Sequence, residues 1–230
     1  MEFTDLVVVA RNLYRFKKQR DQHKYEDEFF KLLFEQLHNK ILYIDSNIFM
    51  AQSNVGVERF FNEIQEYPNI NITMPTEQYE EIYNLKNSDI EVKAKPARNA
   101  FRIIEKLFDS KHLNIRELKD EPNKVKAYAD PVFIKMITEN LKEQKKVYFI
   151  TEDKDLKIRL KSKVESEKLN IENLVICSFE TLYEDKENLV DEERNRKKDI
   201  KKGEEFLDEL ANGGSLKDKA LDKIAAYISK

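Results

Sequence analysis

The chain has 230 residues, of which 40% are hydrophobic and 37% are charged, and its formal net charge is −3. This length supports one full-sized core with helical additions rather than two large domains. The near balance of 41 basic and 44 acidic residues excludes a globally basic nucleic-acid binder of the histone kind. The four glycines cannot be arranged into a GxGxxG or GxxxxGK[ST] phosphate loop.

The first 39 residues are predicted to form a helical extension, because Phe29, Phe30, Leu33, Phe34 and Leu37 recur at helical spacing without a proline or glycine. This stretch has no secretory-signal layout, and no apolar run in the chain reaches the roughly 20 residues of a membrane helix. We therefore expect a cytoplasmic protein that has no membrane association.

Short apolar runs that end in polar turns then alternate with amphipathic stretches. Strands are predicted at 41–44, 70–74, 113–118, 147–150 and 174–177, and helices after Pro75, over 94–108, from Asp130-Pro131 and over 156–164. Asp130 is expected to be the N-cap of its helix, with Pro131 at the first helical position. The alternation predicts a three-layer α/β/α fold with a mostly parallel sheet and helices on both faces.

Beyond about residue 186 the sequence becomes too charged to build a core, and it is predicted to be a solvated helix or linker. A helical hairpin is expected after it, with a turn at 212–214 and an amphipathic helix over 216–228. That apolar stripe predicts packing on the core or a homodimer.

Acidic residues stand where the predicted strands end. Asp45 and Asp153 follow strands, whereas Glu81 and Asp130 lie near the starts of helices. The carboxyl ends of parallel strands meet at one edge, so these side chains can converge. Because four carboxylates in one crevice repel each other, the pattern predicts a hard divalent cation, Mg²⁺ or Mn²⁺.

Each acid also has a purely structural interpretation. An aspartate after a strand often forms an Asx-turn or caps a helix, and Asp130 before Pro131 would satisfy that role alone. Neighbouring acids compete for the same positions: Glu80 with Glu81, and Glu152 and Asp155 with Asp153. The joint pattern, rather than any single residue, favours a metal site.

Four segments in order, 42–49, 74–86, 129–134 and 149–156, resemble the motifs of the PIN-domain nucleases. The resemblance covers roughly residues 40–182, and we expect a PIN-like nuclease domain at 40–185 between a helical extension at 1–39 and a charged linker with a helical hairpin at 186–230. Gln78 departs from the family pattern, which usually has an apolar residue there.

The resemblance implies metal-dependent hydrolysis of phosphodiester bonds, single-stranded RNA being preferred and DNA the second choice. Its implied catalytic and metal-binding residues are Asp45, Glu81, Asp130 and Asp153, with Asp155 as a further metal ligand and with Asn47 and Thr151 in supporting positions. Phosphate contacts are expected from Lys86, Arg98, Arg102 and Lys154. Besides nucleic acid, an antitoxin-like protein is a candidate partner.

Other enzyme classes fit the sequence less well. A haloacid-dehalogenase-like phosphatase requires a second aspartate two residues after the first, where Asn47 stands, and a response-regulator receiver lacks so long a helical lead. The strongest alternative is a PIN-like scaffold that binds RNA or a protein without cleavage. The nuclease and the non-cleaving scaffold differ in whether the four acids lie close enough together to bridge a metal ion.

Overall fold

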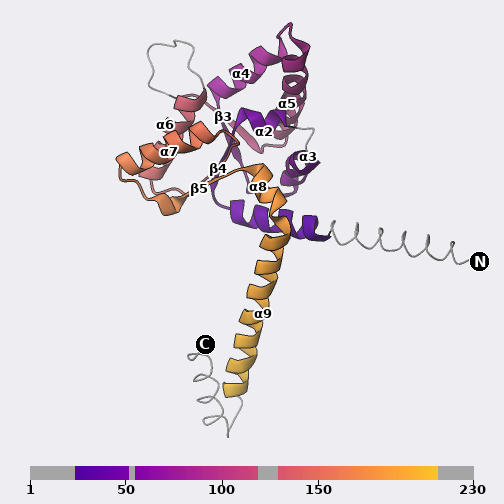
Figure 1. Ribbon diagram of the computed structural model, residues 1–230, viewed down its shortest axis with the longest axis vertical. Helices are drawn as coiled ribbons and strands as arrows, with labels where there is room; N and C mark the ends of the chain where they lie inside the picture. Colours follow the sequence, from indigo (N-terminus) through magenta and orange to yellow (C-terminus); the bar gives the residue numbers. More distant parts are fainter. Residues whose placement is uncertain (1–23, 52–54, 119–128, 212–230) are drawn as a thin grey trace, which may run out of the picture. The chain divides into compact units, whose positions relative to one another are not determined.

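A computed structural model of the chain describes residues 24–51, 55–118 and 129–211 (Figure 1). The chain divides into two compact units, Met1–Lys186 and Glu187–Lys230. In the first unit, five parallel strands form one sheet in the order β3-β2-β1-β4-β5. The strands are β1 (Ile41–Ile44), β2 (Ile72–Pro75), β3 (Leu113–Arg116), β4 (Val147–Ile150) and β5 (Leu174–Cys177). The predicted three-layer α/β/α class is confirmed.

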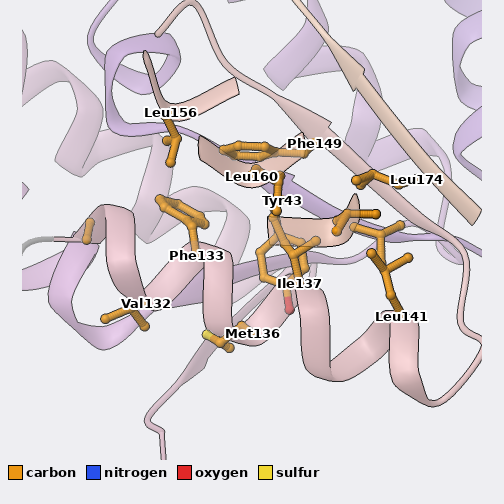
Figure 2. Close-up of a cluster of buried hydrophobic side chains, with 13 residues drawn as sticks. Tyr43, Val132, Phe133, Met136, Ile137, Leu141, Phe149, Leu156, Leu160 and Leu174 are labelled. Carbon is orange, nitrogen blue, oxygen red and sulfur yellow. The ribbon is translucent and has the colours of Figure 1, made fainter. Parts of the chain in front are cut away.

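One face of the sheet is covered by α6 (Ala129–Lys142) and α7 (Lys154–Ser166), which enclose a buried apolar cluster (Figure 2). Tyr43 of β1 meets Phe133 of α6 edge to face, with 6.1 Å between ring centroids. The phenol oxygen of Tyr43 accepts a 2.8 Å hydrogen bond from Asn140. The Tyr43 ring can therefore be buried at little cost, because its hydroxyl group keeps a hydrogen-bond partner.

Aromatic rings form a second cluster, which joins α3 (Val55–Glu63) and α8 (Phe179–Glu184) to the helix at 24–37. Phe60 stacks with Phe34 at 5.6 Å and meets Phe179 edge to face at 5.5 Å. The apolar residues predicted for the helix, Phe29, Phe30, Leu33, Phe34 and Leu37, are all buried. This helix therefore contributes to the core, while the rest of the predicted extension, 1–23, lies outside the described residues.

The remaining elements of this unit connect the strands. They are α2 (Ser46–Met50), α4 (Thr76–Lys86), α5 (Glu91–Asp109) and two short 3₁₀ helices, Ile64–Glu66 and Ile171–Asn173. The prediction that Asp130 caps α6 is wrong, because the helix already includes Ala129 and Asp130 lies in its first turn. Pro131 is tolerated there, since the first backbone N–H groups of a helix have no intrahelical acceptor.

β1 and β2 are joined over a short length, with Leu42 opposite Ile72 as their one register pair. Beyond that pair, the buried side chain of Gln78 in α4 donates a 2.8 Å hydrogen bond to the carbonyl of Ile44. This bond explains why a polar residue stands on the buried side of α4. The amide satisfies a backbone acceptor at the end of β1 that would otherwise be buried without a partner.

The second unit contains α9 (Lys186–Ala211), the charged helix predicted from the sequence. Ion pairs at helical spacing line it, including Arg194 with Asp191 and Arg196 with Glu193. The predicted hairpin turn and last helix, 212–230, lie outside the described residues. None of the helices within 24–51, 55–118 and 129–211 combines the length and apolarity that a membrane span requires.

Candidate active site

The carboxyl ends of β1 and β4 lie next to each other at the centre of the sheet. Ile44 pairs with Ile150, and the backbone N–H of Asp45 donates to the carbonyl of Ile150 at 2.9 Å. The strand order reverses here, because β2 and β3 continue on one side of β1 while β4 and β5 lie on the other. Parallel sheets bind ligands at such reversal points. Asp45 directly follows β1 at this position.

The Asp45 side chain is held in place by neutral donors. The residue is 5% exposed, and its Oδ2 accepts a 2.7 Å hydrogen bond from Oγ1 of Thr151. The Asn47 amide donates a longer bond of 3.4 Å to the same oxygen. Asn47 and Thr151, the two residues predicted in supporting positions, therefore both contact Asp45. Thr151 also accepts from the backbone N–H of Asp153 at 3.0 Å, which ties the loop after β4 to Asp45.

The pKa of Asp45 is raised, first because burial removes water from its carboxylate. The negative charges of Asp130 and Asp153 raise it further, and the hydrogen bond from Thr151 opposes this in part. Three of the predicted acids therefore lie close enough to interact through their charges. Such an arrangement disfavours the ionised form in the absence of a compensating cation.

Glu81 of α4 belongs to the same group of acids. Its pKa is raised by loss of water in the crevice and by the charges of Asp45 and Asp130, while a hydrogen bond with Ser46 lowers it. Ser46 adjoins Asp45 in the chain, so this bond brings Glu81 to the end of β1. Glu80, the alternative left open by the sequence, and Glu81 are both exposed. It is the hydrogen bond with Ser46 and the charges of Asp45 and Asp130 that place Glu81 among the acids.

The other predicted acids have partners of their own. Arg159 of α7 forms ion pairs with Asp130 and with Asp155, the latter at 2.9 Å. Asp153 is the N-cap of α7 and accepts from the backbone N–H of Leu156 at 3.0 Å. Asp153 therefore has a helix-capping role of its own, at the start of α7.

Within the described ranges, no group of three or more His, Cys, Asp or Glu side chains is arranged so that it could hold a metal ion. The charges of Asp130 and Asp153 raise the pKa of Asp45, and those of Asp45 and Asp130 raise the pKa of Glu81, but the four acids are not gathered into one ligand set. Their chemistry nevertheless fits Mg²⁺ or Mn²⁺, which prefer carboxylate oxygens. For Asp130 to join a ligand set, its ion pair with Arg159 has to open.

Of the four predicted phosphate contacts, Lys154 adjoins the acids, as the first residue of α7. Lys86, Arg98 and Arg102 instead lie together on α4 and α5. Lys86 covers the Phe101 ring, with its Nζ 3.8 Å from the ring centroid. The aromatic neighbours of these cations were missed in the sequence, although Tyr79 and Tyr83 are spaced one helical turn apart.

A cavity of about 430 Å³ lies between α6 and α7. Its lining includes Pro131 and Arg159 at the end near Asp130, and Lys163 and Glu167 farther along the helices. The cavity therefore begins beside the acidic group and does not enclose Asp45 or Glu81, which are absent from its lining.

Comparison with known proteins gives no assignment: the chain matches no protein-family model and no curated protein.

Proposed function

We propose that this chain is a metal-dependent nuclease of the PIN-domain type, which hydrolyses phosphodiester bonds in the cytoplasm, preferably in single-stranded RNA. The observation that carries the proposal is the buried carboxylate of Asp45 at the reversal point of the sheet. It is oriented by Thr151, and its pKa is raised in part by Asp130 and Asp153. The resemblance of four ordered segments to PIN motifs supports the same conclusion.

Asp45 and Glu81 are the first ligands that we assign to a divalent cation, with Asp130 and Asp153 completing the set. Carboxylates whose pKa is raised by mutual repulsion are stabilised by an added positive charge. A bound Mg²⁺ or Mn²⁺ would supply a Lewis acid for the phosphodiester and would activate water as the nucleophile.

The side chains of the crevice have distinct tasks in this reaction. Thr151 and Asn47 fix the orientation of Asp45 through its Oδ2. Glu81 accepts a proton from the attacking water, a role open to a carboxylate in this position. The water oxygen bonds to phosphorus, the bond to the leaving sugar oxygen breaks, and that oxygen takes up a proton from solvent.

Cleavage of labelled single-stranded RNA in the presence of Mn²⁺ tests the proposal. We expect Asp45→Asn and Glu81→Gln to lower the rate by about 10² to 10⁴. Glu80→Gln is the matched control, because it removes an exposed carboxylate from the neighbouring position of α4. Equal cleavage by the wild type and all three variants would refute the assignment. Single-stranded DNA in the same assay measures the preference between the two substrates.

A second candidate is a PIN-like scaffold that binds RNA or a protein without cleaving. It is favoured by the ion pair between Arg159 and Asp130, which occupies one of the acids. This candidate predicts that purified wild type binds RNA but leaves it intact with Mg²⁺ or Mn²⁺. Cleavage that is lost in Asp45→Asn would eliminate it.

A further inference from the structure

Three aromatic rings contact one another where α4 and α5 pack. Tyr79 and Tyr83 of α4 both meet Phe101 of α5, with ring centroids 5.4 and 6.0 Å apart. Tyr83 is 46% exposed, and Tyr79 and Phe101 are half-buried. We call these three residues the aromatic patch. Unlike the rings of the core, they remain accessible from solvent.

One positive side chain, Lys86, contacts the aromatic patch, and two more, Arg98 and Arg102, lie near Phe101 in the sequence of α5. Nζ of Lys86 lies 3.8 Å from the centroid of Phe101 and 4.9 Å from that of Tyr83. Arg98 and Arg102, three residues before and one residue after Phe101, are both exposed. Arg98 forms an ion pair with Glu91 of the same helix, but exposed pairs of this kind are weak and open readily.

Accessible rings among lysine and arginine side chains have a defined chemical use. Proteins that bind single-stranded nucleic acid stack bases on aromatic rings and hold the adjacent phosphates with cations. A duplex does not offer its base faces for such stacking. An uncharged apolar partner would have to bury the three cations, which costs free energy without compensating anions.

We propose that the aromatic patch stacks unpaired bases of a single-stranded nucleic acid, while Lys86, Arg98 and Arg102 contact its phosphates. The inference rests on the proposed function, which supplies nucleic acid as the substrate class. It adds that the protein recognises unpaired bases of that substrate. α4 carries both the candidate catalytic acid Glu81 and Tyr83, which at a spacing of two residues project from different sides of the helix.

The sequence contains no tryptophan, which permits a direct test. Tyr83→Trp, made in an Asp45→Asn background to prevent cleavage, places a single fluorescent reporter in the aromatic patch. We expect saturable quenching when oligoadenylate is added, and none with a blunt duplex of the same length. Phe108→Trp is the control, because Phe108 is a 57% exposed ring of α5 outside the patch. Equal quenching at both positions, or none at Tyr83→Trp, would overturn the inference.

Affinity provides an independent measurement. In the same background, Tyr83→Ala is expected to weaken binding of oligoadenylate about tenfold, because one stacked base contributes about 1–3 kcal/mol. Tyr83→Phe keeps the ring and should bind like the parent, as should Phe108→Ala. A plot of the logarithm of the binding constant against the logarithm of the salt concentration has a negative slope. Arg102→Gln should make this slope shallower by about 0.7, the value for one lost phosphate contact. Thermal unfolding establishes that each variant is folded.

The two proposals fail in different ways. If the wild type cleaves RNA while Tyr83→Ala binds as tightly as its parent, the aromatic patch is not a binding surface and the nuclease assignment stands. If the binding pattern is found but the wild type cleaves nothing, the patch stands and the nuclease assignment is lost.

Discussion

Thr151 donates a 2.7 Å hydrogen bond to the buried carboxylate of Asp45, across 106 residues of sequence. The bond joins the ends of two neighbouring strands, and the donor is a neutral hydroxyl rather than a basic side chain. Asp45 is therefore oriented without having its charge cancelled. Burying a carboxylate without a compensating positive charge is costly to a fold, and such sites are commonly functional.

Replacing Thr151 by valine should destabilise the protein. The substitution keeps the side-chain shape but removes both the donor to Asp45 and the acceptor of the Asp153 N–H. Leaving buried polar groups unsatisfied costs about 1–3 kcal/mol, which urea denaturation can measure. Thr151→Ser is the control, since it retains the hydroxyl and loses one methyl group. A valine variant at least as stable as the serine variant would contradict the role of this bond.

Asp45→Asn should make the protein more stable at pH 7 while abolishing activity. Because the pKa of Asp45 is raised in the folded state, the fold binds a proton more tightly than the unfolded chain does. Stability from this group is therefore present at low pH and is lost as the pH rises through the folded-state pKa. The gain in melting temperature should be found at pH 7 and shrink as the pH approaches 4. A variant less stable than the wild type at pH 7 would contradict this account.

Adding Mn²⁺ should raise the melting temperature of the wild type, because a ligand that binds only the folded state stabilises it. The shift should be smaller in Asp45→Asn and in Glu81→Gln, which each lack one proposed ligand. Differential scanning fluorimetry with increasing Mn²⁺ makes the measurement, and Glu80→Gln should shift as the wild type does. An equal shift in all four proteins would place the cation elsewhere.

Cys177 should react slowly with thiol reagents at neutral pH. Burial raises the pKa of its thiol to about 11, and the thiolate is the reactive form. Since the chain has one cysteine, the alkylation rate reports this residue alone. We expect the rate to rise with a midpoint near pH 11 in the folded protein and near the ordinary value of 9 in urea. Coincident midpoints would show that the thiol is solvated.

Gly56→Ala should destabilise the protein although alanine is the better helix former. A Cβ at this position of α3 would lie 2.9 Å from the ring of Tyr183. That ring packs on Phe29 and its hydroxyl donates to Glu26, so it cannot yield freely. Overpacking of this kind costs about 1–3 kcal/mol. Gly203→Ala is the matched control, because nothing lies within 4 Å of its added Cβ and it should be neutral or stabilising.

Much of the sheet could be predicted because its strands are short apolar runs bounded by polar turns. The predicted strands at 41–44, 147–150 and 174–177 agree with β1, β4 and β5, and these bounds put Asp45 and Asp153 at strand ends. By contrast, β2 begins two residues later than predicted and extends through Pro75.

Contacts between side chains far apart in the chain could not be predicted from the sequence. The pairing of Arg159 with Asp130 depends on how α6 and α7 are aligned, which no local pattern encodes. The helical spacing around Phe34 predicted a buried face, but it did not reveal that Phe60 would cover it. Gln78 departs from the resembled family, which usually has an apolar residue at this position. Its hydrogen bond to the carbonyl of Ile44 explains why a polar side chain is buried there.

The hydrogen bond between Gln78 and Ile44 has a mechanical consequence. It anchors α4 to the last residue of β1, immediately before Asp45. Rotation or sliding of α4 would break this bond in a buried place, where water cannot replace the lost partner. The position of α4, and with it that of Glu81, is therefore tied to the backbone next to Asp45.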